Sequence, residues 1–559
     1  MKSTLLKTIK NTNLSSNMVF LVTLLSIYYG FVFNYPIIDK IYILSDNQSV
    51  FYFLSPIILT FAFIIIFSIL ALPYLFKAIQ IPLLITSALA FYASIKYNVM
   101  FDYGMIENIF ETDTGEAFTY INLGSISYFI FLGLLPAFIV FKTKITYAKS
   151  ITREIVNRLL LVLVAVVGIL LIAFFYYKDY ASIGRNNSYL NKMINPAHAF
   201  NSFRYVNRTY FTKKLEYKKI GQDANLEGST NEKPTLMILV VGETARSQNI
   251  FYNGYARNTN PYTQGMDIIS FKDVSSCGTA TAHSLPCMFS NMNRSNYNKN
   301  RAINQDNALD VISHAGVDML WIENDGGDKR VAGNFSKIEI TTEDSPDLCD
   351  AGSCYDEALL QNLDEKIQKN KGNQFIALHI KGSHGPTYWQ RYPESKAHFT
   401  PACNQSDIEN CSDQEIVNVY DNTLVYTDYI IAQTIKKLTE YSKQYNVVLM
   451  YISDHGESLG ENGLYLHGAP YVIAPDEQTQ VPWFMWLGND YANAKGINRQ
   501  CLLDKANNDT FSHDNLFHTL LGLYGVDSAA KDNQLDIIAS CKKGINNIAK
   551  TKTLAPEIN

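Results

Sequence analysis

The chain is organised around the stretch SSCGTATAHSLPCMFS, which runs from Ser275 to Ser290. Two cysteines, Cys277 and Cys287, bracket a segment of small residues with Thr281 at its centre. A disulfide across so short a loop would restrict the position of the Thr281 hydroxyl. This restriction suits a nucleophile, because a reacting atom displaced by about 1 Å can lose on the order of 100-fold in rate.

Apolar runs that end in polar residues flank this stretch on both sides. LMILVVGETARS (Leu236–Ser247) is typical of a buried strand, and Glu243 follows its apolar run. VVLMYISDHGES (Val447–Ser458) is typical of a second buried strand, and Asp454 and His455 follow its apolar run. An acid, a hydroxyl and an Asp-His pair near strand ends predict a metal site with a built-in nucleophile.

The last two thirds of the chain alternate short apolar runs with helical patterns. Continuous apolar runs are expected for strands buried on both faces, and the alternation predicts an α/β fold with a mostly parallel sheet. Functional residues in such sheets collect beyond the carboxyl ends of the strands. The predicted strands are Leu236–Val241, Asp318–Ile322, Phe375–His379, Val447–Ile452 and Val481–Trp486, and the predicted helices include Asp356–Gln368 and Val417–Tyr441.

The 559 residues exceed one ordinary domain. The 47 Lys and Arg against 52 Asp and Glu give a formal net charge of −5, which does not favour a nucleic-acid partner. Five apolar stretches in the first third are each close to the roughly 20 residues that a helix needs to span a bilayer. They are about Asn17–Phe33, Phe51–Leu72, Phe76–Ile95, Ile126–Phe141 and Leu159–Tyr177, and they predict an N-terminal bundle of five transmembrane helices.

The charges between these stretches predict their orientation, because Lys and Arg tend to stay cytoplasmic. The N-terminus is basic, and so is the loop between the fourth and fifth spans, from Lys142 to Arg158. The loop between the third and fourth spans is acidic, from Asp102 to Glu116. Five spans would therefore place the C-terminal part of the chain outside the cytoplasm.

All eight cysteines lie in the polar part of the chain, which agrees with an oxidising compartment. Sequence proximity favours the pairs Cys277–Cys287, Cys349–Cys354 and Cys403–Cys411, and it leaves Cys501–Cys541 by elimination. Free or metal-binding thiols are the alternative, but C-x-x-C spacing is absent. We expect a transmembrane domain over residues 1–178, a bridging segment on the membrane surface over 179–234 and a catalytic domain over 235–559.

The acidic loop contains MIENIFETDTGEAF, in which Asn108, Thr112 and Glu116 recur every four residues. In a helix these three side chains would form one polar stripe. At a membrane surface such a stripe would receive the amine or hydroxyls of a lipid headgroup. The simpler interpretation is the solvated face of an interfacial helix, and periodicity alone favours it.

A zinc site would use Glu243, Asp454 and His455, with the hydroxyl of Thr281 completing the ligand set. A free threonine hydroxyl is a poor nucleophile, and metal coordination activates it by stabilising the alkoxide. Attack on phosphorus would then give a phospho-threonine intermediate. Each residue alone has a structural explanation, such as a helix cap or a loop hydroxyl, but four suitable residue types near strand ends predict a metal site.

Three further histidines accompany these residues. HIKGSHGP supplies His379 and His384, and DHGESLGENGLYLHG supplies His467. Each could hold a second metal, contact the phosphate or protonate the leaving alkoxide as general acid. Lys329, in WIENDGGDKR, would neutralise phosphate charge. Taken alone, His379 is equally well explained as a core histidine.

Together, the five apolar spans and the motifs GETAR, SCGTATAHSLPCMFS, GSHGP and SDHGESLGENGLYLHG resemble the phosphoethanolamine transferases that modify lipid A. This family includes the mobile colistin-resistance proteins, and the resemblance covers essentially the whole chain. It implies an alkaline-phosphatase/sulfatase-like soluble domain that binds Zn²⁺, with room for a second ion. It implies zinc ligands at Glu243, Thr281, Asp454 and His455, headgroup contacts at Asn108, Thr112 and Glu116, and substrate-phosphate or second-metal positions at His379, His384, His467 and Lys329.

The reaction that this resemblance implies is ping-pong. Phosphatidylethanolamine would give its phosphoethanolamine to Thr281 and release diacylglycerol, and a phosphate of lipid A or lipooligosaccharide would then take the group. The resemblance also implies a multi-pass protein of the bacterial inner membrane with its catalytic domain in the periplasm, and we expect a monomer. Masking negative surface charge would weaken the attraction of cationic peptides, so that polymyxin and colistin resistance is expected.

Three alternatives stay open on the sequence. The same chemistry could serve another acceptor, such as a core sugar or glycan. A membrane-tethered phosphodiesterase or sulfatase is the second, although a sulfatase would need a Cys or Ser nucleophile where Thr281 stands. A non-enzymatic envelope protein with a structural metal is the third, but structural zinc sites typically use Cys and His ligands, whereas this set is rich in oxygen.

Overall fold

The computed structural model divides the chain into two compact units. The first unit comprises Met1–Ile106 with Ile121–Phe211, and the second comprises Glu107–Tyr120 with Thr212–Asn559. A short segment between helices of the first unit therefore belongs to the second. The structure describes residues 14–45, 47–112, 117, 120–187, 189–211, 215–226, 233–343, 345–350, 353–406 and 408–542.

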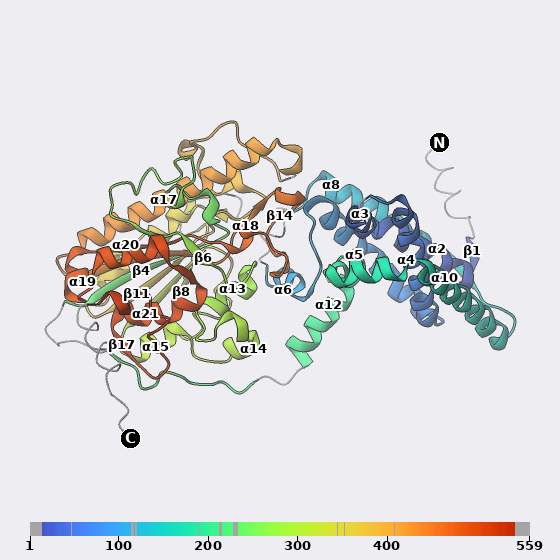
Figure 1. Ribbon diagram of the computed structural model, residues 1–559, viewed down its shortest axis with the longest axis horizontal. Helices are drawn as coiled ribbons and strands as arrows, with labels where there is room; N and C mark the ends of the chain where they lie inside the picture. The colour runs from blue at the N-terminus through green and yellow to red at the C-terminus, as the bar shows by residue number, and fades with distance from the viewer. Residues whose placement is uncertain are drawn as a thin grey trace, which may run out of the picture. The chain divides into compact units, whose positions relative to one another are not determined.

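The first unit is helical (Figure 1). Its long helices are α4 (Ser49–Leu70), α5 (Leu75–Tyr97), α10 (Ile151–Asn186) and a continuous run of α8 (Leu123–Tyr128), a π-helical stretch (Phe129–Leu134) and α9 (Leu135–Lys142). These four are long and apolar enough to cross a membrane. A bent pair, α2 with its π-helical end (Met18–Phe33) and α3 (Tyr35–Leu44), makes five if it counts as one span.

The bend of 55° in that pair has a local cause. Asn34 leaves the helical conformation between the two helices, and Pro36 occupies the first turn of α3. A proline fits the start of a helix because its missing N–H has no partner there. Buried aromatic rings hold the pair in place, with Tyr29 5.1 Å from Phe33 and 5.2 Å from Phe67 between ring centroids.

The second unit is built on a seven-stranded mixed sheet in the order β5-β15-β12-β4-β11-β7-β8. Strands β12, β4, β11, β7 and β8 run parallel, whereas β15 and β5 are antiparallel to their neighbours. The run expected as strand Val481–Trp486 is β15, at one side of the parallel group. The bounds are β4 Thr235–Gly242, β5 Ile269–Phe271, β7 Asp318–Glu323, β8 Ser336–Glu339, β11 Gln374–His379, β12 Asn446–Ser453 and β15 Trp483–Leu487.

Helices cover both faces of this sheet, which explains why the central strands β4 and β12 are buried at every position and mostly apolar (Figure 1). Alternate residues of β4, such as Leu239 and Val241, join a core cluster with α15 (Ala308–His314) and α21 (Leu516–Tyr524). The long helix α17 (Asp413–Glu440) lies on the opposite face. Strands buried on both faces need apolar residues throughout, so the two-sided cover follows from the sequence pattern.

The two helices predicted in this unit differ from the observed ones at their ends. Helix α17 begins at Asp413, because Ser412 and Glu415 form a capping box that satisfies the first backbone N–H groups. The pattern at Asp356–Gln368 is interrupted. A 3-10 helix (Asp356–Leu360) and α16 (Leu363–Gln368) are separated at Asn362, whose φ of 56° is left-handed.

Short helices follow α10, namely α11 (Leu190–Met193), α12 (Ala197–Val206) and a π-helical turn (Asn207–Phe211). Helix α12 leaves two apolar side chains exposed, because Phe200 and Phe203 are 68% and 72% exposed while Tyr205 is buried. Four disulfides occur in the second unit, and they are the expected pairs Cys277–Cys287, Cys349–Cys354, Cys403–Cys411 and Cys501–Cys541.

Candidate active site

Two adjacent parallel strands bring the predicted acid and the Asp-His pair to one edge of the sheet. β4 and β12 pair in register, with Gly242 opposite Ser453 at their carboxyl ends. Glu243 therefore leaves β4 where Asp454 and His455 leave β12. All three side chains are fully buried, as expected for groups in the crevice beyond the strand ends.

Thr281 approaches this edge from a separate segment. It is the first residue of α13 (Thr281–Met288), and it is 6% exposed. Its hydroxyl donates to Glu243 Oε2 at 3.0 Å and lies 3.3 Å from His455 Nε2. The amino end of a helix favours negative charge, which suits the attachment of a phosphoryl group.

The partner of Nδ1 sets the role of the His455 ring. Nδ1 lies 2.9 Å from the carbonyl oxygen of Gly456, which only accepts, so Nδ1 carries the hydrogen. Nε2 is then unprotonated and has a lone pair available, and it lies 3.4 Å from both Glu243 Oε1 and Asp454 Oδ2. Burial, followed by the neighbouring His467, lowers the pKa of His455 well below its usual value, which keeps the ring neutral.

These four residues fit a divalent cation. Two fully buried carboxylates face a neutral imidazole, and burial raises the pKa of Asp454 because the negative charge is costly there. Zinc bonds of about 2.0–2.2 Å to N and O ligands in a tetrahedron separate the ligand atoms by about 3.3 Å. The observed separations around His455 Nε2 are 3.3 and 3.4 Å. The donor set and its spacing therefore suit zinc.

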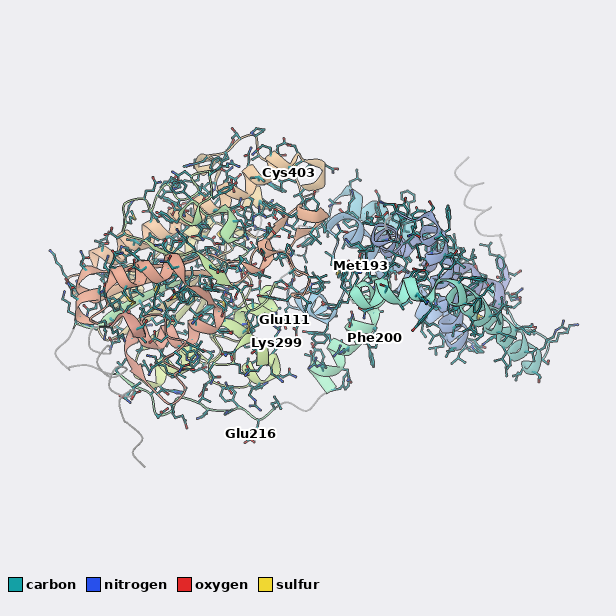
Figure 2. The ribbon with its side chains drawn as sticks, in the orientation of Figure 1. Glu111, Met193, Phe200, Glu216, Lys299 and Cys403 are labelled. Atoms are coloured by element: carbon teal, nitrogen blue, oxygen red, sulfur yellow. A yellow bond between two sulfur atoms is a disulfide. The ribbon has the colours of Figure 1, made fainter. Side chains whose placement is uncertain are left out.

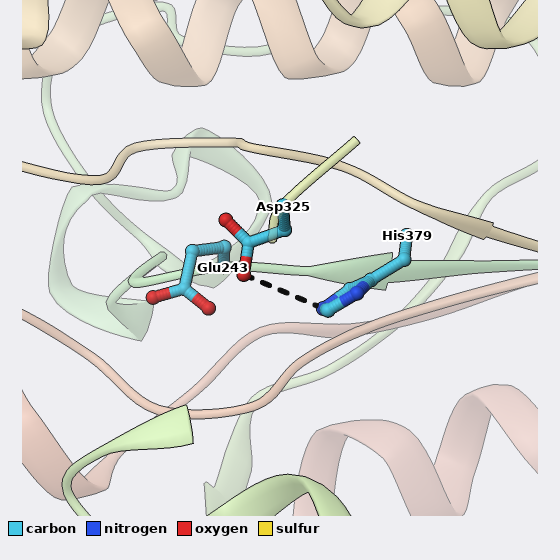
Figure 3. A group of neighbouring side chains, drawn as sticks. All are labelled: Glu243, Asp325 and His379. Atoms are coloured by element: carbon cyan, nitrogen blue, oxygen red, sulfur yellow. Dashed lines mark ion pairs between the residues drawn. The ribbon is translucent and has the colours of Figure 1, made fainter. Parts of the chain in front are cut away.

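A second group of possible metal ligands shares Glu243 with the first and adds Asp325 and His379 (Figure 3). His379 ends β11, and its Nδ1 lies 2.9 Å from the carboxylate of Glu323 while Nε2 lies 3.7 Å from Asp325 Oδ2. Burial alone would lower the pKa of His379, but Glu323 raises it to about 9. Burial raises the pKa of Asp325 to about 7. The His379 ring therefore lies between two carboxyl groups, those of Glu323 and Asp325.

His384 and His467 come together beside His455. The centroids of the His384 and His467 rings are 5.2 Å apart, and those of His467 and His455 are 4.6 Å apart. Nδ1 of His467 lies 3.3 Å from Glu457 Oε2. The two predicted histidines thus form a row of imidazoles with His455.

Lys329 contacts the segment that was expected to carry the polar stripe. Its Nζ donates to the carbonyl oxygen of Glu111 at 3.1 Å. Glu111 and Lys299 also lie together (Figure 2), and Lys299 Nζ is 3.2 Å from a carboxylate oxygen of both Glu107 and Glu111. These contacts keep Glu107–Glu111, the end of α6 (Tyr103–Glu111), within the second unit.

The stripe itself is described only in part. Thr112 Oγ1 donates to the carbonyl oxygen of Asn108 at 2.8 Å, which is the contact expected one helical turn apart. Glu116 lies outside the described residues. Headgroup contacts of Asn108 and Thr112 therefore remain a prediction.

Sequence reasoning missed Glu323 and Asp325. Glu323 ends β7 at the same sheet edge, so the rule about carboxyl ends would have found it. Asp325 follows two residues later.

Comparison with known proteins identifies the family. The model of the family Sulfatase matches residues 235–526, and that of Phosphoethanolamine transferase EptA/EptB matches residues 59–210. Phosphoethanolamine transferase EptA of Escherichia coli (strain K12) is 40% identical over 504 residues, which cover 89% of this chain and 92% of the relative. Phosphatidylethanolamine transferase Mcr-1 of Escherichia coli is 34% identical over 515 residues, which cover 88% and 92%.

Solved structures agree in fold. The integral membrane protein lipooligosaccharide phosphoethanolamine transferase A (EptA) from Neisseria meningitidis has a TM-score of 0.91 at 37% identity, covering 95% of this chain and 99% of its own. The soluble domain of the same transferase has a TM-score of 0.58 at 42% identity, covering 59% of this chain and 100% of its own. The chain therefore belongs to the phosphoethanolamine transferase family, with membrane-spanning N-terminal helices and a sulfatase-like soluble domain.

Proposed function

We propose that the protein transfers phosphoethanolamine from phosphatidylethanolamine to a phosphate of lipid A through a covalent adduct on Thr281. The observation that carries this proposal is the position of the Thr281 hydroxyl, 3.0 Å from Glu243 and 3.3 Å from His455 in a buried site. A hydroxyl at the start of a helix, next to ligands suited to a cation, is a site for phosphoryl transfer.

We propose Glu243, Thr281, Asp454 and His455 as the residues that hold one Zn²⁺. When bound, the ion lowers the pKa of a coordinated hydroxyl and neutralises charge on the phosphate oxygens. A second Zn²⁺ would use His379 together with Asp325 and the shared Glu243. The 3.7 Å between His379 Nε2 and Asp325 Oδ2 supports this second position.

In the first half of the reaction, Thr281 Oγ1 gives its proton to Glu243 Oε2, the acceptor of its hydrogen bond, and forms a bond to phosphorus while the bond from phosphorus to the glycerol oxygen breaks. The leaving oxygen takes a proton, which we assign to His384 or His467 because they adjoin His455. In the second half, an acceptor oxygen attacks phosphorus, the bond from phosphorus to Thr281 Oγ1 breaks, and Thr281 Oγ1 takes its proton back from Glu243 Oε2. Lys329 would stabilise the phosphate charge, and so would His379 where no second ion occupies its Nε2.

We propose a topology of five spans, with the bent pair as the first. The transmembrane domain would cover residues 1–178, the bridging segment 179–234 and the catalytic domain 235–559. The protein would be a monomer in the bacterial inner membrane with its catalytic domain in the periplasm. Four disulfides in the second unit support an oxidising compartment.

The names of relatives support an amphiphilic donor and an amphiphilic acceptor. Mcr-1 is called a phosphatidylethanolamine transferase, and a relative of 30% identity over 314 residues is called Kdo(2)-lipid A phosphoethanolamine 7''-transferase. Addition of an amine to lipid A would mask negative charge, so cells that express the protein would resist polymyxin and colistin. Asn108, Thr112 and Glu116 would contact the headgroup of the donor.

Intact mass of the full-length protein after incubation with phosphatidylethanolamine vesicles tests the covalent step. The wild type should gain one phosphoethanolamine, and Thr281→Ala should gain none. Thr279→Ala is the matched control, because Thr279 is a buried hydroxyl two residues away and bonds to the carbonyl of Ala469. An adduct on Thr281→Ala would refute the assignment of the nucleophile.

Mass spectrometry of lipid A from cells that express the protein tests the acceptor. Phosphoethanolamine on a lipid A phosphate supports the proposal. Phosphoethanolamine found only on a core sugar would refute the proposed acceptor while leaving the covalent chemistry intact.

A further inference from the structure

His513 is a buried histidine that the proposed reaction does not use. It is 1% exposed and begins a 3-10 helix (His513–Asn515) directly after β16 (Thr510–Ser512). Strand β16 pairs in parallel with β6 (Asp273–Ser275), so that Ser512 lies opposite Ser275. This register brings His513 beside the loop that leads from β6 to Thr281.

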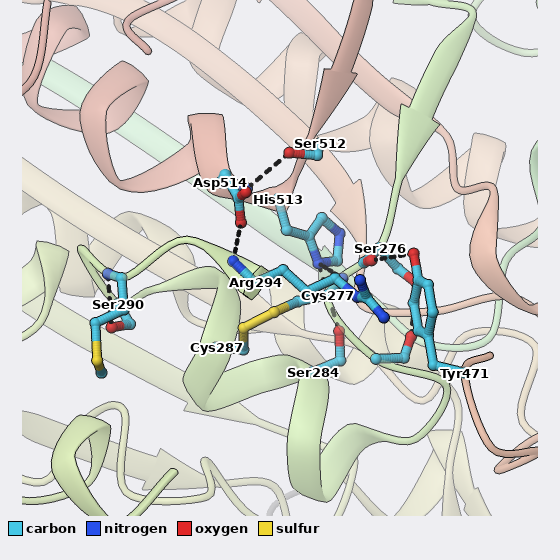
Figure 4. Close-up of a disulfide and its surroundings, with 12 residues drawn as sticks. Ser276, Cys277, Ser284, Cys287, Ser290, Arg294, Tyr471, Ser512, His513 and Asp514 are labelled. Atoms are coloured by element: carbon cyan, nitrogen blue, oxygen red, sulfur yellow. Dashed lines mark hydrogen bonds between the residues drawn. A yellow bond between two sulfur atoms is a disulfide. The ribbon is translucent and has the colours of Figure 1, made fainter. Parts of the chain in front are cut away.

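Both ring nitrogens of His513 are engaged, and Figure 4 shows the ring beside Cys277. The backbone N–H of Cys277 donates to Nδ1 at 3.1 Å, so Nδ1 carries no hydrogen. Nε2 lies 2.9 Å from the carbonyl oxygen of Ser453 and therefore donates to it. The neutral ring joins a residue four positions before Thr281 to the residue before Asp454. Burial lowers the pKa of His513 to about 4, which agrees with this state.

Ser284 makes a second connection between the same two segments. It lies one helical turn after Thr281 in α13, and its hydroxyl donates to the backbone carbonyl oxygen of Asp454. The same hydroxyl is 3.4 Å from His513 Nδ1. The Cys277–Cys287 disulfide then ties the start of the loop to the end of α13. The helix that carries Thr281 is thus linked to the end of β12 directly through Ser284, and indirectly through the disulfide, Cys277 and His513.

We propose that His513 is a positioning residue that sets the distance between the Thr281 hydroxyl and the side chains of Asp454 and His455. This inference rests on the proposed function. A misplacement of about 1 Å costs on the order of 100-fold in rate. Donor binding relies on other residues, so loss of His513 should lower kcat for adduct formation and leave KM nearly unchanged.

Three variants separate the two hydrogen bonds of the ring. His513→Asn keeps an acceptor near Nδ1, His513→Gln keeps a donor near Nε2, and His513→Leu removes both. The rate of phosphoethanolamine gain by the full-length protein is measured with phosphatidylethanolamine vesicles. We expect His513→Leu to lower kcat by about 10- to 100-fold, with partial recovery in the Asn and Gln variants and KM within about twofold.

His518→Leu is the matched control. His518 is 3% exposed, its Nδ1 accepts a hydrogen bond from the backbone N–H of Asp532 at 2.9 Å, and burial lowers its pKa to about 4. It resembles His513 in burial and bonding, but it lies on α21. We expect His518→Leu to weaken the fold and to keep kcat within about twofold of the wild type.

The results distinguish a positioning role of His513 from a role in stability alone. A wild-type kcat in His513→Leu would overturn the inference, because the nucleophile would then not depend on His513. An equal loss of kcat in His518→Leu would also overturn it, because the loss would then reflect a weakened fold. If His513→Leu does not fold, wild-type rates in both the Asn and Gln variants would overturn it. Failure of the wild type to form any adduct would instead refute the proposed function.

Discussion

Removal of the Cys277–Cys287 disulfide would separate its effect on stability from its effect on the nucleophile. The disulfide closes a separation of 10 residues, and Cys501–Cys541 closes one of 40. The chain-entropy relation gives about 2.7 kcal/mol for the shorter loop and about 3.9 kcal/mol for the longer one. We therefore expect the double alanine variant at Cys501 and Cys541 to lose more stability. The variant at Cys277 and Cys287 should lose more activity, by about 10- to 100-fold in kcat, because only this loop leads into Thr281.

Tryptophan fluorescence provides the stability assay for these two variants. All four tryptophans lie in the second unit, and Trp321 and Trp483 are almost fully buried. Urea unfolding of the full-length protein in detergent would therefore follow the unit that contains both disulfides. The rate of phosphoethanolamine gain gives the activity. A wild-type kcat in the variant at Cys277 and Cys287 would refute the idea that the disulfide restricts the nucleophile, and a reversed order of stability would refute the entropy argument.

Three other perturbations test the site and its surroundings. Chelation of zinc should lower the urea midpoint of unfolding, because the buried carboxylates of Glu243 and Asp454 then repel each other, and it should also stop adduct formation. Added Zn²⁺ should restore the midpoint and the adduct. An unchanged midpoint would contradict the metal site. Gly382→Ala should cost about 2–4 kcal/mol of unfolding free energy, because φ is +52° and the new Cβ would lie 2.7 Å from the carbonyl oxygen of Glu243. Gly333→Ala, whose Cβ would meet its nearest atom at 3.7 Å, should cost much less, and equal losses would reject this steric explanation. Burial lowers the pKa of His518 in the folded protein to about 4, so between pH 4 and 6.5 the unfolded chain binds more protons at this residue than the folded protein does. The free energy of unfolding should therefore fall by about 3 kcal/mol as the pH drops through this range. His518→Asn should reduce this pH dependence in urea titrations, and an unchanged dependence would mean that other groups cause it.

The central strands could be read from the sequence because burial on both faces leaves an uninterrupted apolar run. The direction of β15 could not, since an apolar run looks the same in a parallel and an antiparallel strand. The break at Asn362 was also hidden, because the helical pattern of the flanking residues continues across it. The start of α17 could have been predicted from the sequence, since Ser412 and Glu415 have the spacing of a capping box.

The ligand candidates followed from one rule about sheet edges together with the resemblance to a family. Glu243, Asp454 and His455 leave adjacent strands, and Thr281 meets them through a separate loop. The role proposed for His513 could not be inferred in this way. It depends on a hydrogen bond to Cys277 across 236 residues of sequence, which only the pairing of β6 with β16 creates.

The insertion of Glu107–Tyr120 into the second unit has a consequence for protein engineering. The chain passes between the units three times, so no single cut separates them. A recombinant fragment that starts after Phe211 would deprive Lys299 of both its carboxylate partners and Lys329 of the Glu111 carbonyl. Chimeras that join the helices of one relative to the soluble domain of another would have to exchange this segment as well, because its partners lie on the other side of the junction.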